Sequence, residues 1–110
     1  MAAAHEYVLV DTDGSHCVLM PEEGPITLEA CQKAVEGLIL SYNPEIGDEI
    51  TAYINEGANR ASVAPNKAFP GVRGRVLIGR REDGGDFSGL TEAQREHVIN
   101  EVSRRIQEKP

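Results

Sequence analysis

Short β-prone runs, separated by turn residues instead of long helices, dominate this 110-residue chain. The first two runs, at 6–10 and 16–20, flank an Asp13-Gly14 pair, which is typical of a tight hairpin turn. Parallel strands need crossovers of roughly a dozen residues or more, and strands and helices do not alternate here with enough length for a doubly wound sheet. The spacing therefore predicts an α+β fold with a small, mostly antiparallel β-sheet.

Later segments continue this pattern. The run 49–54 alternates between apolar and polar residues, which is typical of a half-buried strand. The segment 72–80 also predicts a strand, and 38–42 is expected to be extended. Between them, 58–71 has the Asn, Pro and Gly residues of a loop, in which a short strand at 60–63 stays an open alternative.

Two amphipathic segments, at about 27–37 and 91–108, predict helices that cover the sheet. Thr27 is a good N-cap for the first helix, and Gly37 is expected just past its end in a left-handed conformation. The apolar residues of this segment recur at helical spacing: Leu28, Cys31, Val35 and Leu38.

The second helix has the clearest signals. Thr91 and Gln94 have the spacing of a capping box, in which each side chain satisfies a backbone N–H of the first turn. Val98, Val102 and Ile106 recur every four residues and form the predicted buried stripe.

Length and composition agree with a single domain spanning 1–110. Apolar residues make up 40% and charged residues 26%, which is ordinary for a globular protein. With no run of 18 apolar residues and no secretory signal, we expect a cytoplasmic, intracellular protein without membrane contact. Cys17 and Cys31 are too few for a disulfide scaffold, and we expect both to be reduced and buried.

Charge is distributed unevenly along the chain, whose formal net charge is −7. Residues 1–56 carry a net charge of −10, 57–81 carry +6 without one acidic side chain, and 82–110 carry −3. Arginine suits forked recognition of carboxylate or phosphate, and Arg73 and Arg75 are expected on the same strand face. The candidate binding residues of this basic segment are Arg60, Asn66, Lys67, Arg73, Arg75, Arg80 and Arg81.

A second interpretation of the basic segment is internal pairing. The arginines would then contact the protein's own acidic side chains, within one chain or across an oligomer, with Asp48, Glu49 and Glu56 as candidate partners. Structural ion-pair networks are common and exposed ion pairs contribute little stability, so the sequence alone leaves this alternative open.

The segment from Val8 to Ser15 resembles the first motif of the haloacid dehalogenase phosphatases, an apolar strand followed by Asp-x-Asp-Gly-Thr/Ser. The resemblance implies that Asp11 is a nucleophile and Asp13 an acid/base. That family also requires a lysine, a later acidic pair for Mg²⁺ and a longer Rossmann-like domain. We therefore favour a hairpin turn built from Asp and Gly.

No other residue pattern indicates catalysis, a metal or a cofactor. Potential metal ligands lack the Cys-x-x-Cys or His-x-x-x-His spacing of zinc sites. They are His5, His16, Cys17, Cys31 and His97. We expect neither metal nor cofactor, and we assign no catalytic residue.

Several short motifs occur in an order that is similar to a small uncharacterised domain family of bacteria and their phages. They are Thr27-Leu-Glu-Ala-Cys-Gln32-Lys-Ala-Val35-Glu-Gly37, Ile54-Asn-Glu-Gly57, Pro65-Asn66, Gly74-Arg-Val-Leu-Ile-Gly79 and Ser88-Gly-Leu-Thr-Glu-Ala-Gln94. The resemblance covers about residues 26–98 and implies no activity. It supports ending the first helix at Gly37. From their residue types, we interpret the Asn-Glu-Gly turn and Asn66 as turn and loop-locking residues and not as catalysts.

The sequence thus favours a non-enzymatic binding or accessory module that docks a protein partner, or a second copy of itself, through the basic 60–81 surface. The alternative is a small-ligand binder whose arginines hold a phosphate or nucleotide. A weaker alternative is a phosphohydrolase that uses Asp11 and Asp13. Nucleic acid is not expected as a partner because the chain is acidic and poor in aromatic residues.

Overall fold

The strands of this protein form one antiparallel sheet in the order β2-β1-β5-β4-β3, with β6 paired to β5. The computed structural model describes residues 6–20, 26–57, 63–81 and 87–107. The strands are β1 (Tyr7–Val10), β2 (His16–Leu19), β3 (Ile39–Tyr42), β4 (Ile50–Asn55), β5 (Val76–Arg81) and β6 (Phe87–Ser88). The predicted α+β class, an antiparallel sheet with two helices, is confirmed.

The hairpin predicted at 6–20 is formed by β1 and β2. Gly14 occupies the turn with a φ of 91°, a left-handed conformation that glycine adopts without strain. The backbone closes the turn because Asp11 N–H donates to the Ser15 carbonyl and Gly14 N–H donates to the Asp11 carbonyl. A Cβ at Gly14 would also meet the Ile106 side chain at 2.4 Å, so the turn lies directly against α2.

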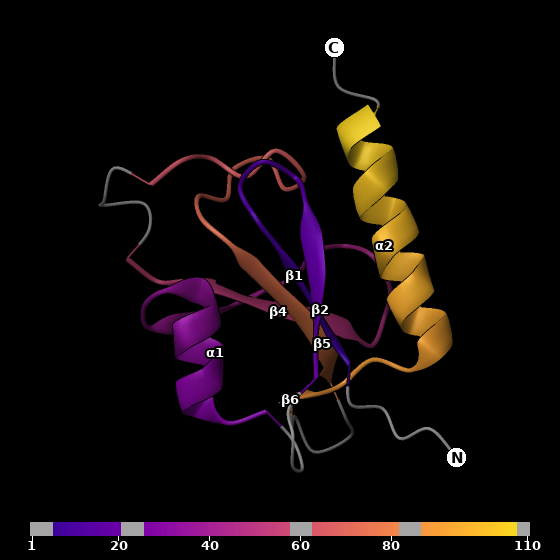
Figure 1. Cartoon of the computed structure of the whole chain (residues 1–110), viewed down its shortest axis with the longest axis horizontal. Helices are drawn as coiled ribbons and strands as arrows, with labels where there is room; N and C mark the ends of the chain where they lie inside the picture. Colours follow the sequence, from indigo (N-terminus) through magenta and orange to yellow (C-terminus); the bar gives the residue numbers. More distant parts are fainter. Residues whose placement is uncertain (1–5, 21–25, 58–62, 82–86, 108–110) are drawn as a thin grey trace.

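The two helices, α1 (Leu28–Val35) and α2 (Glu92–Gln107), lie on opposite sides of the sheet (Figure 1). Alternation along the strands explains how one sheet supports both helices, because successive side chains point to opposite faces. The central strands are accordingly buried on both faces, and all four residues of β1 are buried. We call the two sides the α1 face and the α2 face.

The α2 face holds the larger core. Val98 and Val102 of α2 are fully buried, as the four-residue spacing predicts. They share this core with strand residues, with the loop after β4 and with Leu90 between β6 and α2. The strand and loop residues are Val8, Val10, Ile50, Ala52, Val76, Ile78, Ala68, Phe69 and Val72. The predicted capping box is confirmed, since the side chains and N–H groups of Thr91 and Gln94 bond reciprocally.

The α1 face holds a smaller core, where Cys31, Ala34 and Val35 pack against the sheet. Thr27 caps the helix as predicted, since its hydroxyl accepts from Ala30 N–H. Leu28, which the helical spacing placed in the apolar stripe, is 60% exposed.

The end of α1 differs from the prediction. Glu36, not Gly37, takes the left-handed conformation, with a φ of 66°. Gly37 is required for a different reason, because a Cβ there would lie 2.6 Å from the Asn55 side chain. Asn55 needs this space because its amide donates to the carbonyls of Val35 and Glu36 and so closes the helix end.

Three further expectations concern the cysteines, the start of β5 and a strand at 60–63. Cys17 is exposed, because it lies on the edge strand β2, whereas Cys31 is buried as expected. The fifth strand begins at Val76, later than predicted, because Gly74 has a φ of 88° and interrupts the extended chain. The open alternative of a strand at 60–63 falls mostly on residues outside the described ranges.

Candidate functional site

The basic segment does not form one surface in the described part of the chain. The loop 63–75 contains Lys67 and Arg73 and precedes β5, whereas Arg81 is the last residue of β5. A strand rises about 3.3 Å per residue, so the two ends of β5 are roughly 16 Å apart. Arg60 lies outside the described residues.

Asn66 is the buried polar residue that holds this loop, with 2% of its surface exposed. Its amide nitrogen donates to the carbonyls of Val10, Asp11 and Gly74 at 3.3, 3.2 and 2.9 Å. Its amide oxygen accepts from Ala68 N–H at 2.9 Å. The side chain is therefore fully engaged within the protein and ties the loop to the end of β1.

Arg75 pairs with the protein's own acids. Its Nε lies 3.6 Å from a carboxylate oxygen of Asp11 and 3.8 Å from one of Glu36. The expectation of internal pairing holds at this position, although its partners are not those that the sequence suggested. The same-face expectation for Arg73 and Arg75 loses its basis, because Arg73 precedes β5 and the left-handed Gly74 separates the two residues.

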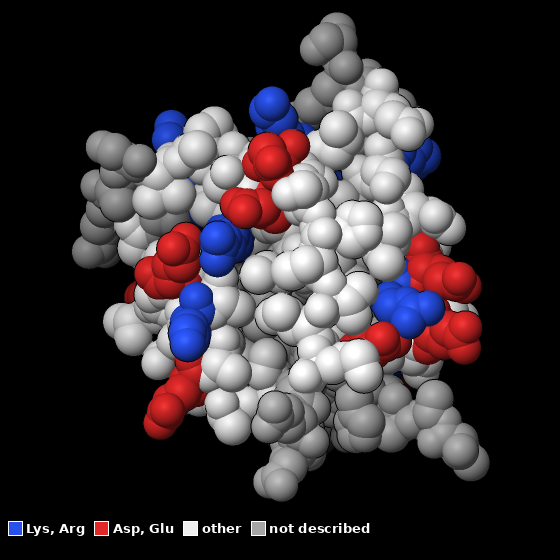
Figure 2. Space-filling view, in the orientation of Figure 1, with Lys and Arg blue, Asp and Glu red and all other residues white. Residues whose placement is uncertain are grey.

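The remaining members of the basic segment have varied surroundings. Arg73 is exposed and donates to the Val63 carbonyl at 2.9 Å. Arg80 donates to the Gly89 carbonyl at 3.2 Å. Lys67 is exposed, and its backbone N–H donates to the Thr12 carbonyl at 3.0 Å, so it lies beside the β1–β2 turn. On the face shown in Figure 2, basic side chains lie mostly beside acidic ones.

Asp11 and Asp13 have structural roles in the hairpin turn. Asp11 accepts from Thr12 N–H at 2.7 Å. The Asp13 carboxylate accepts from the backbone N–H and the hydroxyl of Ser15, and these bonds hold the pKa of Asp13 below its ordinary value. In the described residues, no group of three or more His, Cys, Asp or Glu side chains could hold a metal ion.

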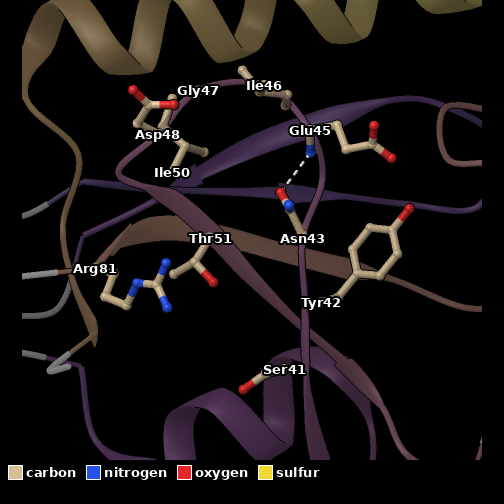
Figure 3. Close-up of a pocket in the computed structure, with 10 residues that line it drawn as sticks. All are labelled: Ser41, Tyr42, Asn43, Glu45, Ile46, Gly47, Asp48, Ile50, Thr51 and Arg81. Atoms are coloured by element: carbon tan, nitrogen blue, oxygen red, sulfur yellow. Dashed lines mark hydrogen bonds between the residues drawn. The ribbon is translucent and has the colours of Figure 1, made fainter.

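Arg81 is exposed and lines an open cavity of about 680 Å³, where β3 and β5 end and β4 begins (Figure 3). The sheet register explains its position. Leu77 packs on the α1 face, so alternation places Arg81 on that face too. Ser41 and Thr51 share that face because Ile39 and Tyr53, two residues from each, also pack there.

Within the cavity, Arg81 is the only cationic lining residue. Its side chain forms no ion pair or hydrogen bond with another residue within 6–20, 26–57, 63–81 or 87–107. Figure 3 shows the guanidinium and the Thr51 side chain directed toward the same part of the cavity. The other lining residues are Ser41, Tyr42, Asn43, Glu45, Ile46, Gly47, Asp48 and Ile50.

The rest of the lining is mainly polar. Burial, the largest effect, raises the pKa of the Tyr42 hydroxyl above its ordinary value of 10.0, so the group stays protonated and can donate at neutral pH. Asn43 accepts from Glu45 N–H through its side-chain oxygen, which leaves its amide nitrogen as a donor. Figure 3 shows the Glu45 carboxylate directed away from Arg81, and Asp48 lies on the opposite side of the cavity.

An aromatic cluster borders this site on the α1 face. A Cβ at Gly79 would lie 2.6 Å from the Phe87 ring, so Phe87 covers Gly79 directly. The Phe87 ring contacts those of Tyr53 and Tyr7, with centroid separations of 4.5 and 5.3 Å. These rings separate the core under α1 from the polar region around Arg81.

Sequence reasoning missed the residues that accompany Arg81. Ser41, Tyr42 and Thr51 have no motif, and only the folded sheet brings them into the lining of the same cavity as Arg81. The register places Thr51 beside Gly79, two residues from Arg81, and Ser41 level with Leu77, four residues from Arg81. It also missed Arg105, which donates to the carbonyls of Pro44 and Ala68 and lies 5.1 Å above the Phe69 ring. Arg105 thereby fixes the 43–49 loop that forms one wall of the cavity.

This arrangement defines a small α+β domain with a polar, arginine-containing cavity at one end of its sheet. The model of DUF3846, a domain of unknown function, matches residues 6–103. The chain therefore belongs to this family, and the match extends beyond the segment that the sequence motifs covered. No curated protein and no solved structure gave a match. In the described residues, no helix is long and apolar enough to cross a membrane.

Proposed function

We propose that this domain is a non-enzymatic binding module and that its ligand binds in the cavity at Arg81. One observation carries the proposal: the Arg81 guanidinium lies without a described acidic partner in a cavity whose lining on the same face of the sheet also includes the Thr51 hydroxyl. A guanidinium presents its donors in a planar fork that matches a carboxylate or a phosphate. The aspartates that resemble a phosphatase motif serve the β1–β2 turn instead.

The lining suggests the chemistry of the ligand. An anionic group, either phosphate or carboxylate, would contact Arg81 and accept a hydrogen bond from Thr51. Glu45 and Asp48 also line the cavity, and their carboxylates accept hydrogen bonds. We therefore expect the part of the ligand away from its anionic group to carry hydrogen-bond donors. A volume of about 680 Å³ is within the usual range for small-ligand sites, roughly 300–1,000 Å³.

Isothermal titration calorimetry tests this proposal with inorganic phosphate, AMP, ATP and N-acetylglutamate as probes. We expect at least one probe to bind the native protein, and Arg81→Gln to weaken its binding about tenfold or more. Arg73→Gln is the matched control, because Arg73 is exposed and contacts only a backbone carbonyl among the described residues. Equal losses in both variants, or no binding of any probe at millimolar concentration, would contradict the proposal.

A second candidate function is docking of a protein partner, or of another copy of the chain, on the loop 63–75. The observation that favours it is the firm attachment of this loop through Asn66, which presents Lys67 and Arg73 to solvent. Sedimentation velocity at low and high salt tests self-association. A mass that rises only at low salt, and not in a Lys67→Glu/Arg73→Glu variant, would support this function.

A further inference from the structure

Among the described residues, β3 is an edge strand whose outer hydrogen-bonding groups have no strand partner. Glu56 N–H donates to the Leu38 carbonyl at 2.8 Å, which makes these residues a hydrogen-bonded pair of the β3–β4 ladder. Such pairs alternate along an antiparallel ladder. The backbone groups of Ile39 and Ser41 therefore point away from β4, toward the open edge.

The side chains along this edge carry no charge, and two of them are exposed leucines. Leu38 and Leu40 are 64% and 48% exposed, and alternation places both on the same face. The segment 38–42 contains no charged residue and no proline. Natural proteins usually protect sheet edges with lysine, proline or a bulge, so this edge is suited to pairing with another strand.

The edge is continuous with the cavity. Ser41 and Tyr42, the last residues of β3, both line it. A strand added beside β3 would therefore pass the mouth of the cavity, three strand spacings or about 14 Å from β5. An acidic side chain of that strand would meet Arg81 only with both side chains extended toward each other across β4. The strand's own N–H groups are donors of the kind that Glu45 and Asp48 favour.

We propose that the β3 edge binds an extended segment of a partner protein as an additional strand. Backbone hydrogen bonds to Ile39 and Ser41 provide affinity, and alternate apolar side chains of the segment cover Leu38 and Leu40. One acidic residue of the segment contacts Arg81. This last contact rests on the proposed function of the cavity, whereas strand addition does not.

The size and charge of the edge favour a peptide segment over a second copy of the chain. A stable interface between two protein copies buries roughly 1,200–2,000 Å². β3 has only four residues, so pairing two β3 edges would bury little surface. Two copies would also each carry a net charge of −7. The same charge favours a segment with one acidic residue over a long acidic run.

The probes are ten-residue peptides selected from a random displayed library for binding to the full chain. Fluorescence anisotropy measures the affinity of each selected peptide. The test variant is Ser41→Pro, which removes an N–H that points to the open edge and leaves the β3–β4 ladder intact. Its matched control is Val18→Pro on β2. The Asp11–Ser15 hydrogen bond fixes the β1–β2 register, so the Val18 N–H also points to an open edge.

We expect selected peptides to alternate apolar residues and to contain one acidic residue. Ser41→Pro should weaken their binding at least tenfold, and Val18→Pro should leave it unchanged. Leu40→Lys is a second variant, expected to weaken binding similarly, and it decides the question if Ser41→Pro does not fold. Recovery of no peptide, or equal losses in Ser41→Pro and Val18→Pro, would overturn strand addition.

The same peptides separate this inference from the proposed function. Arg81→Gln should weaken the binding of peptides that contain the acidic residue. It should leave unchanged the binding of the same peptides with glutamine in place of that residue. If Ser41→Pro abolishes binding while Arg81→Gln has no effect, strand addition holds and the role of Arg81 is wrong. The molar mass of the native protein in solution is a further check. If it doubles as the protein concentration rises, and if the Leu40→Lys variant stays monomeric, a second copy binds β3 and the peptide proposal is overturned.

Discussion

Arg75 and Asp11 form an ion pair, with 3.6 Å between Arg75 Nε and Asp11 Oδ1, that joins the basic segment to the acidic N-terminal half. Glu36 lies on the same guanidinium at 3.8 Å. Part of the uneven charge along the sequence is therefore neutralised when the chain folds. Arg75 thus has a structural explanation, whereas Arg81 has no such explanation in the described residues.

Neutralising Arg75 should have a small effect on stability. Arg75→Gln is expected to lower the free energy of unfolding by less than about 1 kcal/mol, because the side chains of the pair are 34% and 46% exposed and solvent screens them. Arg75→Glu should cost more, since it places a third carboxylate beside Asp11 and Glu36. Urea denaturation measures both, and equal stability of native protein and Arg75→Glu would show that the pair does not form in solution.

Asn66 should be far less tolerant. Asn66→Ala would remove the hydrogen bonds of the side chain to the carbonyls of Val10, Asp11 and Gly74 and to the N–H of Ala68, at a cost of roughly 2–3 kcal/mol. Asn43→Ala is the control, because Asn43 is exposed and accepts one hydrogen bond in a local turn. Denaturant melts that show similar losses for the two variants would contradict the anchoring role of Asn66.

The elements of the fold follow from local signals in the sequence. Hairpin chemistry at Asp13-Gly14 and the capping box at Thr91 predict the elements that the structure contains, because these signals act over a few residues. The left-handed Glu36 was missed because the space that requires glycine at Gly37 is set by Asn55, which is distant in sequence. Likewise β6 was missed, since two residues carry no periodicity and pair only where β5 is already placed.

The candidate site was less predictable than the fold. Sequence alone identified Arg81 as one of seven binding candidates but gave no reason to separate it from Arg75. That distinction depends on which acidic residues the sheet brings near each guanidinium. The hydroxyls of Ser41 and Thr51 reach the site through strand register, which a single sequence does not specify.

Val102 is the central residue of the α2 stripe and is fully buried. Val102→Asp would bury a carboxylate without a partner, so we expect a loss of at least about 3 kcal/mol or complete unfolding. Asn100→Asp, at an exposed position of the same helix, should change stability by less than about 0.5 kcal/mol. Circular dichroism melts check both, and a loss below about 1 kcal/mol for Val102→Asp would contradict the packing of α2.

Glu101 should make stability depend on pH in the acid range. Hydrogen bonds from Arg104 and Arg105 hold the pKa of Glu101 below its ordinary value of 4.5 in the folded protein. The resulting stabilisation is fully present above pH 4.5 and is lost as the pH falls through the lowered pKa. Glu101→Gln should reduce the slope of unfolding free energy against pH below 4.5, and an unchanged slope would argue against these contacts.

The central claim is that Arg81 and the strands beside it form the ligand site, and an NMR titration tests it most directly. Two-dimensional ¹H–¹⁵N spectra would be recorded while the tightest anionic probe from calorimetry is added to the native protein. The account predicts that the largest shifts involve the amides of Ser41, Thr51 and Arg81, and that they disappear in Arg81→Gln. Shifts concentrated at Lys67 and Arg73, and unchanged in Arg81→Gln, would contradict it.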